Sequence, residues 1–163
     1  MLACHLSFGN CSVIVVWRKV NAASEREGVM IRYIEVKSRN RSEFIDITGQ
    51  VQEVVRGAGV RNGMCHLFVL HTTAGVTVNE GVDPAVQRDM VTFLNKLVPH
   101  DPYFTHAEGN SDAHIKSSII GTSQRLFIEN TKLVLGAWQT VYFCEFDGPR
   151  QRRVAVKITS DEG

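Results

Sequence analysis

The sequence predicts a single α+β domain in which a mixed or antiparallel β-sheet carries two main helices and one short helix. Two segments, beginning near Thr48 and Pro84, repeat apolar residues with helical spacing, and a shorter helix is expected at 113–120. About seven strand candidates surround them, and the last, at 152–158, alternates as in a sheet with one wet face. The 163 residues, 44% hydrophobic and 21% charged, suffice for one domain with a substantial core.

The first half of the domain is expected to begin with a strand, continue through a helix and return as a second strand. The segment "IRYIEVK" at 31–37 has the composition of a strand. Thr48 is placed to N-cap a helix that ends near Gly57 or Gly59. The apolar face of this helix consists of Val51, Val54, Val55 and Ala58. The run "MCHLFVL" at 64–70 is continuously apolar, which predicts a strand buried on both faces.

The second main helix begins with an N-cap carboxylate, Asp83, followed by Pro84 at the first helical position. It stops before Pro99, and its apolar residues keep helical spacing: Val86, Met90, Phe93, Leu94 and Leu97. After a loop at 99–111, a short helix at 113–120 is expected to be capped by Ser111 or Asp112. The predicted buried stripe of the short helix is formed by Ile115 and Ile119.

The last third of the chain reads as strands. Candidates lie at 124–128, at 133–146 with a break near Gly136, and at 152–158. The aromatic residues expected in the core of this part are Trp138, Tyr142 and Phe143. Residues 1–29 are predicted to be an N-terminal extension, either an extra strand or an upstream start, because Met30 opens a segment that reads like the start of the domain at 30–163.

Composition narrows the classes of partner. The net charge of +1 gives no general attraction to nucleic acid or to an anionic membrane, and no apolar run approaches the ~20 residues that span a bilayer. Cys65 and Cys144 lie in strand-like runs, where a thiol behaves as a small core hydrophobe. No cysteine spacing indicates a disulfide scaffold, so the sequence predicts a cytoplasmic protein with neither a nucleic-acid nor a membrane partner.

Three polar clusters follow the ends of apolar elements and are candidates for the functional site. The first comes directly after the strand at 64–70 and contains His71, Asn79, Glu80 and Asp83. The second, "HAEGNSDAHIK", contains His106, Glu108, Asn110, Ser111, Asp112, His114 and Lys116. The third, "LGAWQTVYFCEFDGPRQRR", contains Gln139, Glu145, Arg150, Arg152 and Arg153. The start of the short helix is a ready anion site, and the arginines either bind phosphate or form a solvated edge.

A divalent metal is one interpretation of these clusters. The imidazoles of His71, His106 and His114 could be ligands, together with carboxylate oxygens from Glu80, Asp83, Glu108 and Asp112. The spacing between His106 and His114 matches no local metal motif, however, so neither zinc nor magnesium follows from it.

Four blocks, "FIDIT", "HTTAGVTVNEGVDP", "HAEGNSDAHIKSSIIG" and "LGAWQTVYFCEFDGPRQR", together resemble the YjbQ family, whose members are named secondary thiamine-phosphate synthase enzymes. The resemblance covers about residues 30–160 in unbroken order. It implies a YjbQ-like α+β fold, a homotrimer and a pocket between subunits. It also implies weak thiamine-phosphate synthase activity, in which a pyrimidine methyl diphosphate joins a thiazole phosphate and pyrophosphate is released.

Carried onto this chain, the resemblance implies a set of site residues. The expected catalytic residues are His71, Glu80, Asp112 and His114. The residues expected to bind the phosphorylated substrate are Asn79, Asn110, Ser111, Lys116, Gln139 and Arg150. The positions at which a magnesium or zinc ion would be held are His71, His106 and His114, with Asp83 and Glu108. Two other functions fit the same groups: a metal-assisted hydrolase of unknown substrate, and a non-catalytic module that binds a metabolite or a partner.

Overall fold

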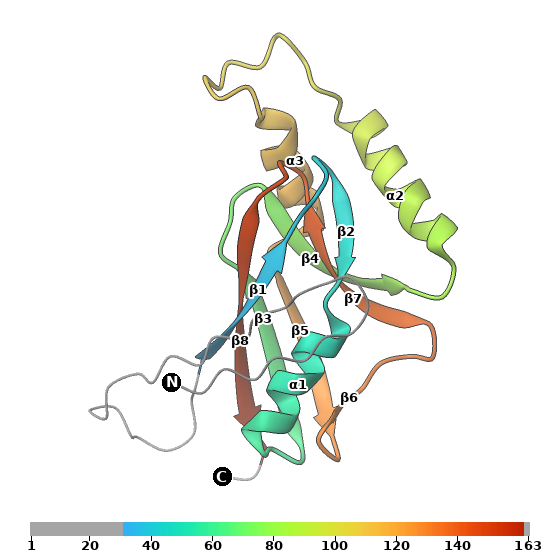
Figure 1. Ribbon diagram of the computed structural model, residues 1–163, viewed down its shortest axis with the longest axis vertical. Helices are drawn as coiled ribbons and strands as arrows, with labels where there is room; N and C mark the ends of the chain where they lie inside the picture. Colours follow the sequence, from blue (N-terminus) through green and yellow to red (C-terminus); the bar gives the residue numbers. More distant parts are fainter. Residues whose placement is uncertain (1–30, 162–163) are drawn as a thin grey trace, which may run out of the picture.

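The computed structural model describes residues 31–161, so the predicted extension at 1–29 lies outside the described residues. The described part folds as an α+β domain with three helices and eight strands, and every strand pair is antiparallel (Figure 1). The predicted fold class is confirmed. In order, the elements are β1 (Ile31–Lys37), β2 (Glu43–Asp46), α1 (Thr48–Ala58), β3 (Gly63–Val69), β4 (Ala74–Glu80), α2 (Pro84–Leu97), α3 (Ser111–Ile120), β5 (Ser123–Glu129), β6 (Lys132–Leu133), β7 (Gln139–Glu145) and β8 (Gln151–Ser160).

The strands form two sheets rather than one. The larger sheet has the order β1-β8-β3-β5-β6, and the smaller has the order β2-β7-β4. The break predicted near Gly136 is confirmed, since the segment that was expected as one long strand is divided into β6 and β7. These two strands belong to different sheets, so the break is the point where the chain crosses from the larger sheet to the smaller one.

The main core fills the space between the two sheets and α1. Along β8, Val154, Val156 and Ile158 are buried while Arg153 is exposed, as the alternation predicted. These three side chains join apolar residues from β1, β3, β5 and β7 and the buried face of α1. Burial of this apolar surface is the main force that holds the sheets together.

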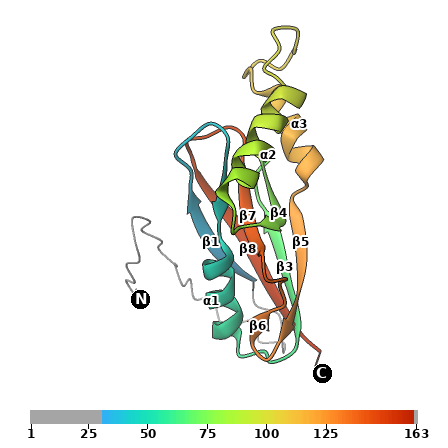
Figure 2. The ribbon, with the colours of Figure 1, turned by 90° about the vertical axis from the view of Figure 1, so that its right-hand side faces the viewer.

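A second, smaller core lies on the other face of the three-stranded sheet. Phe44, Tyr142 and Cys144 point to this side from β2 and β7, and Leu94 of α2 and Ala113 of α3 cover them. Figure 2 shows α2 and α3 together at one end of the molecule, with α1 at the other end. Among residues 31–161, the small sheet is therefore covered on both faces, whereas no helix of this part covers the second face of the large sheet.

Helix α1 ends as predicted but begins differently. It stops at Gly59, whose φ of 71° is the left-handed conformation that glycine adopts at helix ends. Thr48 is not the N-cap: it is the first helical residue, and Ile47 precedes it as the cap. The Thr48 N–H donates to the Asp46 carboxylate at 2.8 Å, while the Thr48 hydroxyl accepts from the Val141 N–H at 2.9 Å. The threonine hydroxyl thus ties the helix to β7 instead of capping its own backbone.

Helix α2 has the predicted start. Asp83 accepts a hydrogen bond from the Ala85 N–H at 2.7 Å, and Pro84 is the first helical residue. The predicted apolar stripe is only partly buried, because Leu94 is its one buried residue while Phe93 and Leu97 are 63% and 54% exposed. The helix touches the small sheet along one narrow face, and its adjacent apolar stripe faces outward.

Helix α3 differs most from the prediction. Its N-cap is Asn110, whose carbonyl accepts from the N–H groups of Ala113 and His114, so neither Ser111 nor Asp112 is the cap. The predicted buried stripe was also wrong, because Ile115 and Ile119 are exposed. The buried face of the helix consists instead of Asp112, Ala113, Lys116 and Ser117. Polar residues can turn inward here because each has a partner inside the protein.

Strand β3 was predicted to be buried on both faces, and this is wrong. Cys65, Leu67 and Val69 face the core, but Phe68, on the opposite face, is 50% exposed. The continuous apolar run instead reflects an apolar outer surface of the large sheet, which we call the outer sheet face. Its exposed apolar residues on three strands are Ile31, Tyr33, Phe68 and Phe127. A patch of this kind is typical of an interaction surface.

The remaining predictions for the core hold with one exception. Tyr142 and Phe143 are buried, but Trp138, expected in the core, is 66% exposed just before β7. Cys65 and Cys144 are buried free thiols, and burial raises the pKa of Cys65 to about 12. No helix among the described residues is both long enough and apolar enough to cross a membrane.

Candidate active site

A pocket of about 670 Å³ lies where the end of β3 meets α3. His71 and Thr72 line it from the turn between β3 and β4, and His114, Ser117 and Ser118 line it from α3. The Ser117 hydroxyl donates to the Ala74 carbonyl at 2.8 Å, which fixes α3 against the start of β4. Two histidines from distant parts of the sequence therefore face one cavity, as the resemblance implied for His71 and His114.

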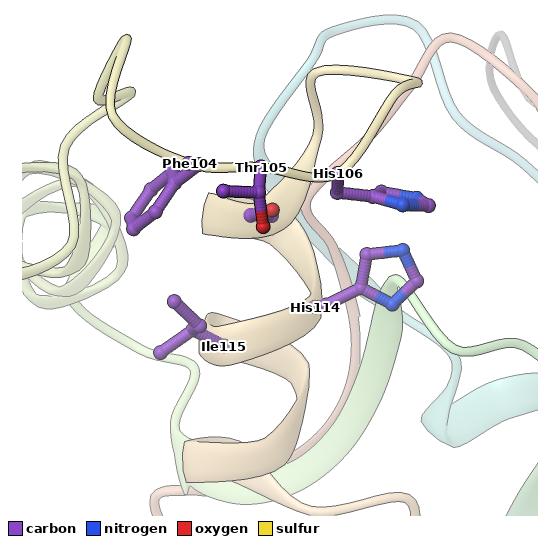
Figure 3. Close-up of a pocket in the computed structure, with 6 residues that line it drawn as sticks. Phe104, Thr105, His106, His114 and Ile115 are labelled. Atoms are coloured by element: carbon purple, nitrogen blue, oxygen red, sulfur yellow. The ribbon is translucent and has the colours of Figure 1, made fainter.

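A second pocket of about 470 Å³ adjoins the start of α3 (Figure 3). Its polar side carries His106, Ser111 and His114, and its apolar side carries Phe104 and Ile115. The rings of His106 and His114 pack edge to face with their centroids 5.3 Å apart. His114 thus lines both pockets and is the residue that connects them.

His71 is held by the neighbouring strand. Its Nε2 accepts a hydrogen bond from the Arg153 backbone N–H at 2.8 Å, and the Leu70 N–H donates to the Arg153 carbonyl at 3.4 Å. Burial lowers the pKa of His71, and the positive charge of Arg152 lowers it further. An Nε2 that accepts a hydrogen bond cannot carry a proton, so the neutral ring has its proton on Nδ1.

Asp112 and Lys116 do not line either pocket but form a buried brace between α3 and its neighbours. Lys116 Nζ donates to the Asp112 carboxylate at 3.0 Å and to Asn95 of α2 at 2.8 Å. Arg41, from the loop between β1 and β2, donates to the other Asp112 oxygen at 3.0 Å. Burial alone would raise the pKa of Asp112, but Lys116 and Arg41 outweigh it and lower the pKa. The geometry gives this pair a structural role rather than the expected catalytic and phosphate-binding roles.

A second buried ion pair lies behind His71 and joins two members of the third polar cluster, neither of which is in the site that the resemblance implies. Arg152 donates to both oxygens of Glu145, at 2.7 and 2.6 Å, and to the Thr73 hydroxyl at 2.9 Å. Glu145 also accepts from the Ser38 hydroxyl and from the N–H groups of residues 146 and 147. Burial would raise the pKa of Glu145, but Arg152 and these hydrogen bonds lower it. Arg152 is therefore neither a phosphate ligand nor part of a solvated edge.

The alternation of inward and outward positions along β8 could have shown, from the sequence alone, that Arg152 points inward. It shares the inward-facing positions of β8 with Val154 and Val156, as its position two residues before Val154 requires. Arg152 stands in one charge run with Arg150 and Arg153, but the alternation along β8 turns Arg152 inward and Arg153 outward, while Arg150 precedes the strand. Glu145 lies on the core side of β7 for the same reason.

Arg150 and Asn110 converge on a single carboxylate. Arg150 donates to the Asp147 side chain at 2.8 Å, and the Asn110 amide nitrogen donates to the same oxygen at 2.9 Å. Neither residue lines the two pockets. They fix the turn between β7 and β8 next to the start of α3, so their expected role in phosphate binding has no support in one chain.

The remaining predicted residues lie at the other end of β4. Glu80 pairs with Gln139 of β7 and Asn79 pairs with Thr140. Because β4 is extended, Glu80 stands roughly 20 Å from Ala74, the residue at the end near α3. Asp83 lies beyond it and caps α2. Within one chain, the residues expected at one site therefore lie in two separate groups. We call them the histidine half (His71, His106 and His114) and the Glu80 half (Asn79, Glu80 and Gln139).

The described residues of one chain offer no metal centre. Among them, no three His, Cys, Asp or Glu side chains lie close enough to hold an ion. Nε2 of His71 is already bonded to the backbone, and Asp112 is bonded to Arg41 and Lys116. Glu108 is exposed in the loop before α3. The donors expected to hold zinc or magnesium therefore do not fit a three-ligand site in the described part of the chain.

Comparison with known proteins identifies the family. The family model described as "UPF0047 protein YjbQ-like" matches residues 32–161. A UPF0047 protein of Methanocaldococcus jannaschii is 46% identical over 133 residues, which cover 82% of this chain and 96% of the relative. The UPF0047 protein YugU of Bacillus subtilis is 42% identical, over 79% of this chain and 98% of the relative.

Solved structures agree with the sequence relatives. A crystal structure of an uncharacterised YjbQ/UPF0047 family protein from Clostridium acetobutylicum has 52% identity and a TM-score of 0.76, covering 77% of this chain and 98% of that one. A YbjQ-like protein of unknown function from Sulfolobus solfataricus has 31% identity and a TM-score of 0.78, covering 82% of this chain and 98% of that one. The chain belongs to the UPF0047 YjbQ-like family.

Proposed function

We propose that the protein is an enzyme that acts on a small phosphorylated substrate, with a transfer reaction like that of a thiamine-phosphate synthase. The observation that carries the proposal is the position of His114, which lines one pocket with His71 and another with His106. An imidazole nitrogen can accept or donate a proton, so histidines that share a cavity are suited to proton transfer. The pockets have the volume of small-molecule sites, which is roughly 300–1,000 Å³.

The surroundings of His114 suit a phosphorylated ring compound. The smaller pocket adjoins the N-terminus of α3, where the first backbone N–H groups of a helix favour an anion. Phe104 and Ile115 give the same pocket an apolar wall against which a ring can pack. In the proposed reaction the bond between the pyrimidine methylene carbon and the pyrophosphate oxygen breaks, and that carbon bonds to the thiazole nitrogen. His114 would protonate the leaving pyrophosphate.

We further propose that the working unit is a homotrimer whose sites lie between copies. Two features of the chain support this. The outer sheet face exposes Phe68, which also lines the larger pocket, so a copy that covers this face would close the pocket. The Glu80 half of the expected site is too far from His114 to reach it within one chain. An assembly with head-to-tail contacts brings the two halves of different copies together and closes as a ring.

Replacing His114 with alanine should reduce turnover of the pyrimidine diphosphate and thiazole phosphate pair by about 10²–10⁴-fold, the usual contribution of a general acid or base. Thiamine phosphate formation is measured by chromatography, and folding is checked by circular dichroism. His100→Ala is the matched control, because His100 is exposed and lines neither pocket. Equal turnover in the H114A and H100A variants would refute the role of His114. A wild-type chain that bound pyrophosphate without turnover would be a binding module instead.

Sharing of the site between copies predicts complementation. Glu80→Gln and His114→Ala chains, each inactive alone, should recover about a quarter of the wild-type activity when co-expressed at equal levels. In random head-to-tail trimers, one contact in four joins an intact His114 to an intact Glu80. The measurement is the total activity of all trimers, purified through one tag that both chains carry. No recovery above the sum of the single variants would show that the site is not shared in this way.

A further inference from the structure

The ring of His71 takes the place of a backbone acceptor at the end of the β3–β8 ladder. The last residue of β3, Val69, pairs with Val154, and beyond it the Leu70 N–H reaches the Arg153 carbonyl. The next partner for the Arg153 N–H would be a carbonyl, but Nε2 of His71 accepts that hydrogen bond instead, at 2.8 Å. A backbone N–H can only donate, so this contact requires an unprotonated Nε2.

The residues around this contact are themselves fixed. Arg152 is 6% exposed and holds the Thr73 hydroxyl at 2.9 Å, two residues after His71. Glu145, which has no exposed surface, holds Arg152 through two hydrogen bonds. The strand on one side of His71 and the turn on the other are thus tied to the same buried ion pair. The imidazole has little freedom to turn over and exchange its two nitrogens.

The charges around His71 also disfavour protonation of its neutral ring to the imidazolium. Arg152 and Arg153, both on β8, disfavour the imidazolium, and Glu145 on β7 favours it. His114 lines the same pocket from α3. Two positive neighbours and partial burial outweigh one carboxylate that is already bonded to Arg152, which agrees with the tautomer that the backbone contact requires.

We infer that His71 is held as the neutral Nδ1–H tautomer and works as a hydrogen-bond donor toward the pocket, with Arg152 and Glu145 as positioning residues. Nδ1–H is the one polar group of the ring left for a ligand, since Nε2 is taken. The ligand atom that faces His71 is therefore an acceptor, such as a phosphate or carbonyl oxygen. This role rests on the proposed phosphate-site function, and it replaces the catalytic and metal-ligand roles expected for His71.

The tautomer is tested by ¹⁵N NMR of the histidine rings in the full chain between pH 6 and 8, with His71→Asn to assign the signals. The expected result is a protonated Nδ1 and a bare Nε2 for His71 at pH 7 and at pH 8. A proton on Nε2, or an imidazolium at pH 7, would overturn the inference. Thr73→Val removes one hydrogen bond from the positioning network and should loosen this preference without unfolding the protein.

The donor role is tested with inorganic pyrophosphate as the probe, by calorimetry on the whole protein. His71→Asn places an amide where Nδ1 was, whereas His71→Gln places it where Nε2 was. The asparagine variant should bind within about threefold of the wild type, and the glutamine variant roughly tenfold to a hundredfold more weakly. Equal binding by both variants would overturn the donor role. A wild-type protein that does not bind pyrophosphate would overturn the proposed phosphate function, while the NMR result would still decide the tautomer.

Discussion

Replacing Arg152 with leucine should lower the free energy of unfolding by about 3–5 kcal/mol, the usual cost of leaving one buried charge without its partner. The Glu145 carboxylate has no exposed surface, and both of its oxygens bond to Arg152. The Ser38 hydroxyl would remain at 2.9 Å, but it carries no charge to balance the carboxylate. Urea denaturation at neutral pH, followed by circular dichroism, measures the change.

Two further variants separate the ion pair from a general effect of losing an arginine. Arg125→Leu removes an exposed arginine from the middle of β5 and should change the stability by no more than about 0.5 kcal/mol. The double variant R152L/E145L removes both charges and should regain much of the loss, because it leaves no unpaired charge. If R152L cost no more than R125L, the buried pair would not contribute to stability.

Lys116→Met should cost about 3 kcal/mol, the lower end of the range for breaking a buried ion pair. Methionine keeps the apolar length of the side chain but removes the ammonium that joins Asp112 to Asn95. Asp112, which is 1% exposed, would keep Arg41, whose own side chain is half exposed, and the exposed ring of His100 at 3.9 Å. The loss should appear as a lower midpoint in urea with an unchanged slope.

The matched control for this variant is Lys96→Met. Lys96 lies in the last turn of α2 and is exposed, so the same exchange of side chain should change the stability by no more than about 0.5 kcal/mol. A K116M protein as stable as K96M would mean that the brace between α3 and α2 is replaceable by apolar contact alone.

Local sequence patterns predicted an element correctly where a single physical requirement determined where it begins or ends. Asp83 followed by Pro84 fixed the start of α2, and Gly59 ended α1, because each residue type satisfies a specific backbone requirement. The alternation along β8 also predicted its buried face. Periodicity failed for Ile115 and Ile119, since it counts apolar residues and cannot show that the opposite face of α3 carries paired charges. The prediction that β3 is buried on both faces failed because a continuous apolar run can also place apolar side chains on an exposed face of a sheet.

The candidate site was predictable in part for a similar reason. Motif resemblance selected His71, His106 and His114, and these residues do line the two pockets. It gave no information about distance, so it placed Glu80 with them although β4 separates the two groups. The pairing of Arg152 with Glu145 was missed because a charge run in a sequence does not show which of its members turns inward. The pairing of distant strands decides this, and the pairing is a property of the whole fold.

Helix α2 is attached to the rest of the molecule by a narrow contact, so its local unfolding should cost less free energy than unfolding of the sheets. Leu94 is the only residue of this helix that is buried. The side-chain hydrogen bonds of α2 to the rest of the described residues are few: Gln87 donates to the Phe44 carbonyl, and Asn95 accepts from Lys116 and Ser42. Such an element can detach by local unfolding at a much smaller free-energy cost than melting either sheet. The chain from its end leads through the loop to His106, so each opening would carry one wall of the smaller pocket away from α3. The rate at which α2 opens would then limit how fast a ligand enters the smaller pocket, while the sheets keep His71 in place.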